Sequence, residues 1–313
     1  MLETFFYPIG TPGQPWGAAE RDLWRVRQVR QRSHADDVLS AIDALRGQWD
    51  VEPYGEVAYA NAHQAPERFA LRALRSRHWL PGLPSVLVTG GVHGYETSGV
   101  HGALRFAQLH AAQLAGRANL LIVPCVSPWA YERFQRWNFD AIDPNRAFRP
   151  ESPAQESAAL MRLVAPLHGQ FAAHIDLHET TDTDESEYRP AVAARDGKPF
   201  EPGSIPDGFY LVDDTNNPQP AFQQAIIDAV SRVTHIAPAD DRNEIIGSPV
   251  VAPGVIRYAM KQLGLCASIS GARYTTTTEV YPDSPRATPE QCIEAQVAAA
   301  CAAVEFVLAD AQR

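Results

Sequence analysis

A histidine and a glutamate lie three residues apart directly after an apolar segment, and together they could bind one metal ion. The segment 85–89 (SVLVT) is typical of a buried strand, and it leads into GGVHGYE, which contains His93 and Glu96. Imidazole and carboxylate are ligands that zinc accepts, and a catalytic zinc site needs three protein ligands and one open position. The same spacing also fits a histidine in a turn and a glutamate in the first turn of a helix, where the helix dipole favours it. A metal site therefore requires a third ligand.

His178 is the candidate third ligand. It follows the apolar segment 171–177 and precedes a polar loop rich in threonine and acidic residues. A histidine at the exit of a strand could instead be a hydrogen-bonded turn residue. His174 lies four residues earlier on the same face of this predicted strand, and a role in the core or in support of the site suits it better. Ligands of open α/β sheets gather where strands end, so the three side chains could meet there.

The segment 133–148 (RFQRWNFDAIDPNRAF) carries groups that could bind anions. Guanidinium groups are the preferred partners of carboxylates and of developing oxyanions. This segment could also be an ordinary charged loop in solvent. However, Asn145 and Arg146 lie between a proline and the apolar pair Ala147-Phe148, which is an unusual place for a charge without a function.

A single carboxylate interrupts the strongly β-prone segment 274–281 (YTTTTEVY). A lone glutamate near the end of a strand is usually a residue at the rim of a sheet. In a zinc cleft, Glu279 would be the base that takes a proton from the attacking water.

Helix-like and strand-like segments alternate along the chain, which predicts an α/β fold with helices on both faces of a sheet. The residue periodicity predicts helices over 18–45 and 97–114. Two more helices are predicted to start at Ser152-Pro153 and Thr288-Pro289, each with a glutamine at the third helical position. The predicted strands are 51–60, 68–74, 86–89, 120–123, 171–177 and 274–281. The segments 182–218 and 237–256 are rich in proline, glycine and aspartate, and we expect surface loops there.

Composition limits the classes of function. The chain has 313 residues, 45% of them hydrophobic, and a formal net charge of −10, which argues against nucleic acid as a partner. No run of 18 apolar residues and no recognisable signal peptide occur, so we expect neither a membrane span nor export. The four cysteines are scattered, which favours free thiols and a cytoplasmic location. We expect one domain, 1–313, with a helical N-terminal extension over residues 1–50.

Taken together, these motifs resemble the zinc carboxypeptidase superfamily of carboxypeptidase A over about residues 84–281. The order is HxxE, an arginine before a D-x-N-R-x-F motif, a histidine at the end of a strand, and a glutamate in a β-strand. The segment 91–96 (GVHGYE) is also similar to the G-x-H-G-x-E opening of the succinylglutamate desuccinylase and aspartoacylase branch. The resemblance implies a three-layer α/β/α fold with a central mixed, mostly parallel sheet.

The resemblance also implies a role for each matching residue. His93, Glu96 and His178 would bind one zinc ion per chain, and Asp143 would orient His93. Arg136 would stabilise the oxyanion and Glu279 would be the general base. Asn145 and Arg146 would bind the terminal carboxylate of the substrate. Tyr258 is the candidate for the tyrosine that closes over the substrate. Pro144 and Ala147 depart from the family's usual residues, but neither change removes a functional group.

The expected function is a zinc metallocarboxypeptidase that removes C-terminal residues from peptides. A deacylase of N-acyl amino acids, of the desuccinylase and aspartoacylase type, is an alternative. A non-catalytic zinc- or peptide-binding relative is another, although such relatives should have lost the base or a ligand. Two acidic groups in the expected loops either interact with solvent or make the cleft mouth attractive to cationic substrates; they are Asp182, Asp184, Glu185 and Glu187, and Asp240, Asp241 and Glu244.

Overall fold

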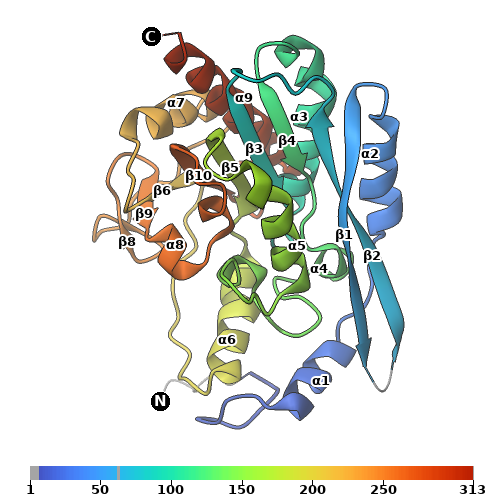
Figure 1. Ribbon diagram of the computed structural model, residues 1–313. Helices are drawn as coiled ribbons and strands as arrows, with labels where there is room; N and C mark the ends of the chain where they lie inside the picture. Colours follow the sequence, from blue (N-terminus) through green and yellow to red (C-terminus); the bar gives the residue numbers. More distant parts are fainter. Residues whose placement is uncertain (1–6, 62–63, 313) are drawn as a thin grey trace.

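The structure is a computed structural model that describes residues 7–61 and 64–312 (Figure 1). At its centre is an eight-stranded mixed sheet in the order β1-β2-β4-β3-β5-β10-β6-β9. The four central strands, β4, β3, β5 and β10, are parallel, whereas β1, β2 and β6 each have an antiparallel neighbour. The strands are β1 (Trp49–Asn61), β2 (Gln64–Ser76), β3 (Ser85–Gly90), β4 (Asn119–Val123), β5 (Phe171–Glu179), β6 (Tyr210–Asp214), β9 (Val255–Tyr258) and β10 (Tyr274–Val280). A separate small pair consists of β7 (Glu244–Ile245) and β8 (Ser248–Pro249).

Helices cover both faces of the sheet, so the predicted three-layer α/β/α fold is confirmed (Figure 1). One face packs against α2 (Ser40–Ala44), α3 (Thr97–Leu114), α7 (Pro220–Val230) and α9 (Pro289–Asp310). The other face packs against α5 (Gln155–Val164) and α8 (Met260–Leu263). The described residues also contain the α-helices α1 (Ala18–Val26), α4 (Pro128–Arg133) and α6 (Arg189–Arg195).

Alternation along β5 places its polar residues on one face. Ile175 and Leu177 belong to the core beneath α3 and α9. Because successive side chains of a strand point to opposite faces, His174, Asp176 and His178 all point to the other face. The same period of two places Glu279 of β10 on that face, and Glu279 pairs in register with His178. The sheet therefore brings the candidate base beside the candidate third ligand.

The described N-terminal residues contain three short helical pieces, α1, η1 (Ala35–Leu39) and α2. Helix α1 packs its buried Trp24 against Trp129 and Trp137. The π-helix η1 leads into α2. Residues 1–6 of the expected extension lie outside the described residues.

Two local predictions were wrong. The helix after Ser152 begins at Gln155, with Ala154 at its N-cap and no side-chain cap, because the Ser152 hydroxyl accepts the Ala154 N–H in a tight turn instead. The segment 182–218 is not a plain loop: it contains a π-helix η4 (Asp184–Tyr188), α6 and the internal strand β6. By contrast, the capping box at Thr288 is confirmed, with Gln291 hydrogen-bonded back to the cap.

Helix α9 is long and apolar enough to cross a membrane by length and composition alone, among the residues described. Its most apolar window has a mean hydropathy of 1.7, and 56% of that window is buried inside the protein. It packs against α3, α7 and β10, as a core helix does. The search of the sequence for a run of 18 apolar residues does not find this helix, because polar side chains such as Gln296 interrupt it. Gln296 donates a hydrogen bond to the backbone oxygen of His178.

Candidate active site

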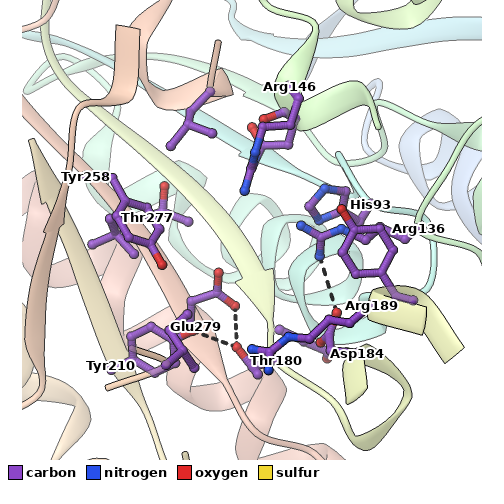
Figure 2. Close-up of a pocket in the computed structure, with 16 residues that line it drawn as sticks. His93, Arg136, Arg146, Thr180, Asp184, Arg189, Tyr210, Tyr258, Thr277 and Glu279 are labelled. Atoms are coloured by element: carbon purple, nitrogen blue, oxygen red, sulfur yellow. Dashed lines mark hydrogen bonds and ion pairs between the residues drawn. The ribbon is translucent and has the colours of Figure 1, made fainter. Parts of the chain in front are cut away.

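A cavity of about 210 Å³ opens at the carboxyl ends of β3, β5 and β10 (Figure 2). Its walls contain His93, Arg136, Asn145, Arg146 and Glu279. Together with Tyr258, six of the predicted site residues, drawn from distant parts of the sequence, therefore line one cavity. Parallel strands end at the same edge of a sheet, which is why segments far apart in the chain meet here.

The three predicted metal ligands lie together in the structure. The candidate ligand atoms of His93, Glu96 and His178 all lie within 4.8 Å of one another, and all three residues are buried. Glycines permit this geometry: Gly91 has a φ of +60°, and a Cβ on Gly94 would lie 2.0 Å from the backbone nitrogen of Tyr131. The HxxE segment thus follows a tight turn that packs directly on α4.

The polar contacts of the two histidines fit a bound cation. Each histidine has its Nε2 against a carboxylate, His93 at 2.9 Å from Asp143 and His178 at 2.7 Å from Asp176. Such a carboxylate fixes the proton on Nε2, which leaves Nδ1 as a lone-pair donor. Both Nδ1 atoms lie 2.7 Å from the Glu96 carboxylate. Three electron-pair donors directed at one another in a buried space are the arrangement that a metal cation satisfies.

The pKa values of Glu96 and His178 without a bound cation also indicate that this site suits a positive charge. Burial alone would raise the pKa of Glu96, but His178 and His93 lower it to about 2. Burial would lower the pKa of His178, yet Asp176 and Glu96 raise it well above its ordinary value. Without a metal, a proton on His178 therefore takes the place of the positive charge. Metal binding at this site should release that proton.

Asp143 connects the metal ligands to the predicted oxyanion arginine. One of its oxygens accepts from the Asn145 backbone and faces His93, and the other accepts from Arg136 Nε at 3.2 Å and from the Tyr188 hydroxyl at 2.9 Å. Burial would raise its pKa, but Arg136 and His93 hold it well below its ordinary value. Asp143 thus lies where the resemblance placed it, and it holds Arg136 as well as His93.

Arg136 is held from several sides. Its NH1 lies 3.4 Å from Asp184 and 3.9 Å from Glu96. Its guanidinium carbon lies over the ring of Tyr188, 4.2 Å from the ring centroid. A guanidinium stacked on a ring and paired with carboxylates loses little freedom when it meets an anion. Arg136 is therefore a preorganised positive group beside the metal ligands.

Asn145 and Arg146, the pair predicted to bind the substrate carboxylate, lie in two different environments. Arg146 is exposed in the cavity, and its NH1 donates to the backbone oxygen of Asn145. Asn145 is buried, with its side-chain oxygen accepting from the Cys266 N–H and its amide nitrogen 3.3 Å from His178 Nε2. The Arg146 side chain thus faces the cavity, whereas the Asn145 side-chain oxygen is already engaged with the Cys266 N–H.

Glu279 lines the cavity beside Thr180 and Tyr210 (Figure 2). Its Oε2 accepts from the Thr180 hydroxyl at 3.0 Å. Burial raises its pKa from the ordinary value of 4.5 to about 8, and the charges of Glu96 and Asp184 add to the effect while His178 opposes it. A carboxylate with a raised pKa next to a metal site has the properties of a general base.

Tyr258 also lines this cavity, as the last residue of β9. Its backbone oxygen accepts from Thr215, so the residue is part of the sheet edge and not of a free loop. Burial raises the pKa of its hydroxyl. Its place in the cavity agrees with a substrate contact, and its role in closure stays a prediction.

Several residues of the site were not identified from the sequence. Thr180, Tyr188, Arg189 and Tyr210 line the cavity although the segments that carry them were expected to be loops. Glu179 binds the N-terminus of α3, with its two oxygens accepting from Thr97 and Ser98. Asp176 could have been found, because it lies two residues before a ligand on the same strand face.

Of the two interpretations of the acidic groups, a negative cleft mouth finds little support in their positions. Of the seven acidic residues in the two groups, only Asp184 lines the cavity, where it pairs with Arg136. Glu185 pairs with Arg189 at 2.6 Å, and Glu187 accepts from Tyr7. Two arginines, Arg146 and Arg189, point into the cavity from opposite sides (Figure 2). The cavity wall therefore carries positive as well as negative side chains, with Glu179, Asp184 and Glu279 among the latter.

Comparison with solved structures shows which fold this is. A candidate metallopeptidase from Shewanella amazonensis SB2B superposes with a TM-score of 0.64 at 20% identity, over 90% of this chain and 98% of that one. A metallo-carboxypeptidase from Burkholderia cenocepacia gives 0.55 at 16% identity, over 96% and 70%. Carboxypeptidase A from Helicoverpa armigera gives 0.56 at 14% identity, over 96% and 74%. The fold is that of the zinc carboxypeptidases.

A family profile matches part of the chain. Residues 82–199 match the profile of the succinylglutamate desuccinylase/aspartoacylase catalytic domain. The matched region contains the three candidate metal ligands, Arg136 and the Asn145-Arg146 pair. No curated protein sequence matches the chain. Residues 82–199 are thus similar to that catalytic domain, and the chain as a whole has the fold of the zinc carboxypeptidases.

Proposed function

We propose that this protein is a zinc metallocarboxypeptidase, a hydrolase that removes the C-terminal residue of a peptide. The observation that carries the proposal is that one cavity is lined by His93 of the candidate metal triad, by the carboxylate of Glu279 and by the exposed side chain of Arg146. Each of these groups has a separate task in the hydrolysis of an amide bond next to a free carboxylate.

His93, Glu96 and His178 would hold the zinc. Two imidazole nitrogens and one carboxylate form a ligand set that catalytic zinc sites use, with one position left for water or substrate. When bound, zinc would lower the pKa of a water toward about 7 and polarise the scissile carbonyl.

Glu279 would move the proton. As the oxygen of the attacking water bonds to the carbonyl carbon, Glu279 accepts the proton that the water loses. When the C–N bond breaks, Glu279 returns this proton to the leaving nitrogen. Its raised pKa of about 8 suits a group that must take up a proton and then release it.

Arg136 would stabilise the negative charge that develops on the carbonyl oxygen. Removal of one such donor commonly costs about 3 to 4 kcal/mol of transition-state stabilisation. Asp143, Asp184 and Tyr188 already hold its guanidinium in place, so little reorganisation is needed during the reaction.

Arg146 would bind the free carboxylate of the substrate. This contact restricts cleavage to the bond next to the chain end. The cavity of about 210 Å³ has room for a leaving group of roughly one residue.

An N-acyl amino acid deacylase is the second candidate function. The match of residues 82–199 to the desuccinylase/aspartoacylase profile favours it. The same residues would act in the same way, with the acyl group taking the place of the peptide.

A substrate comparison tests both functions. The zinc-loaded protein would be assayed with peptides of graded length and with N-acyl amino acids, and peptides with an amidated C-terminus would be the control. A carboxypeptidase should cleave peptides with a free C-terminus faster than N-acyl amino acids, and its rate should increase with peptide length. Exclusive cleavage of N-acyl amino acids supports the deacylase. Hydrolysis of neither class by the zinc-bound protein would contradict both.

We also propose that the protein works in the cytoplasm. All four cysteines are free thiols, and three of them are buried. Thiols stay reduced in that compartment. A disulfide-bonded form isolated from cells would contradict this.

A further inference from the structure

Glu279 is held by a short chain of hydroxyl groups. Thr180 Oγ1 lies 3.0 Å from Glu279 Oε2 and 2.8 Å from the Tyr210 hydroxyl (Figure 2). Within the described residues, Thr180 is the only hydrogen-bond partner of the Glu279 carboxylate. The orientation of this carboxylate therefore depends on one hydroxyl group.

The direction of the hydrogen bonds in this chain follows from valence. An ionised carboxylate can only accept, so Thr180 donates its single hydroxyl proton to Glu279. The oxygen of Thr180 then has only lone pairs to offer, so Tyr210 donates to Thr180. Hydrogen bonds in such a chain polarise and strengthen one another.

The sheet holds all three residues rigidly. Thr180 donates its backbone N–H to Val280, directly beyond the end of β5. Glu279 is paired in antiparallel register with Tyr210 of β6. Thr180 and Tyr210 are both buried, and a β-branched side chain has few rotamers. The hydroxyl of Thr180 is therefore fixed relative to the carboxylate.

We propose that Thr180, supported by Tyr210, is the positioning residue for the general base: it holds Glu279 Oε2 and so leaves Oε1 to exchange the proton. Figure 2 shows the second oxygen of Glu279 turned away from Thr180 and into the cavity. The inference rests on the proposed function, in which Glu279 takes a proton from water and returns it to the leaving nitrogen. Because Oε2 is occupied, that proton stays on the oxygen nearest the substrate.

The test is a set of threonine variants of the zinc-loaded protein. Thr180→Val removes the hydroxyl and keeps the shape, and Thr180→Ser keeps the hydroxyl. We expect kcat of Thr180→Val to fall by about 10- to 100-fold, since misplacement of a reacting group by about 1 Å can cost that much. KM should stay within about twofold, and Thr180→Ser should recover most of kcat. Tyr210→Phe should lower kcat by roughly a few-fold, because loss of its hydroxyl weakens the hydrogen bond between Thr180 and Glu279.

Thr275→Val is the matched control. Thr275 lies on the same strand face as Glu279 and is buried, and within the described part of the chain its hydroxyl has no hydrogen-bond partner. The same chemical change there should leave kcat unaltered. An equal decrease of kcat in Thr180→Val and Thr180→Ser would overturn the proposal. So would a change in KM with an unchanged kcat.

Two further measurements separate this inference from the proposed function. If Glu279→Gln is inactive while Thr180→Val is fully active, only the inference fails; if Glu279→Gln is active, the assignment of the base fails. A crystal structure of zinc-loaded Thr180→Val provides a readout without turnover. We expect its Glu279 carboxylate to rotate or become disordered, and an unchanged orientation would overturn the proposal even if no substrate were known.

Discussion

Glu279→Gln is the substitution that tests the proposed chemistry most directly. The amide has nearly the same shape as the carboxylate, and its oxygen can still accept the Thr180 hydroxyl, but it cannot take a proton from water. A positioned acid–base group contributes about 10²- to 10⁴-fold, so turnover should fall by at least about 10²-fold. Zinc content should stay the same, because Glu279 is not among the candidate metal ligands.

The same substitution should change the pH dependence of stability in the metal-free protein. The pKa of Glu279 is about 8 in the folded chain, above its ordinary value of 4.5. A carboxyl group with a raised pKa contributes stability that is complete below about pH 4.5 and is lost as the pH rises through about 8. One pKa unit corresponds to about 1.4 kcal/mol, so the loss has an upper limit of about 5 kcal/mol, which water in the cavity reduces.

Chemical denaturation of the metal-free proteins at pH values from 4 to 9, in steps of about one unit, measures this effect. The free energy of unfolding of Glu279→Gln should increase relative to wild type between about pH 4.5 and 8, since the amide does not titrate. Glu201→Gln, at an exposed position, is the control. Stability differences that do not vary with pH would refute the electrostatic argument, and near-normal turnover would refute Glu279 as the base.

Three further predictions follow from the site. His178→Ala should abolish stoichiometric zinc binding, and full occupancy by metal analysis would contradict the ligand assignment. Asp143→Asn should weaken zinc binding by about 10- to 100-fold, as loss of a carboxylate behind a ligand histidine does, and an unchanged Kd in a competition titration would contradict it. Because Arg146 and Arg189 line the cavity, substrates with an acidic leaving residue should show higher kcat/KM than basic ones, and Arg189→Glu should reduce that preference at low salt. Equal rates for Glu- and Lys-terminated substrates would reject this.

Local sequence was sufficient for features that depend on short-range geometry. The pair His93 and Glu96 lies within one turn, so its ability to share a metal follows from spacing alone. The alternation of β5 places His174, Asp176 and His178 on one face for the same reason. Capping at Thr288 also depends on residues within a single turn, and the structure contains it. These predictions needed no knowledge of distant contacts.

Predictions failed where a local turn competes with a helix cap and where contacts between distant segments decide the outcome. Ser152 has the residues of a capping box, but its hydroxyl closes a tight turn instead. Strand β6 was taken for part of a loop because it is short and follows a segment rich in proline and glycine; antiparallel pairing with β10 stabilises it as a strand. The acidic residues after His178 looked available for substrate. In the structure Arg136 pairs with Asp184 and Tyr7 binds Glu187, both from distant segments, and Arg189 pairs with Glu185 one turn away.

The sequence by itself therefore determined the types and order of the reactive groups: two histidines and a glutamate for a metal, arginines for anions and a late glutamate for a proton. Only the tertiary structure decided which of these groups meet. The parallel register of β5 and β10 places Glu279 beside His178, and the return of the chain through η4 and α6 brings Tyr188 and Arg189 to the cavity. The physical reason is that spacing along a chain fixes neighbours within a turn or a strand, whereas contacts between distant segments depend on sheet register and on how the faces of the sheet are packed.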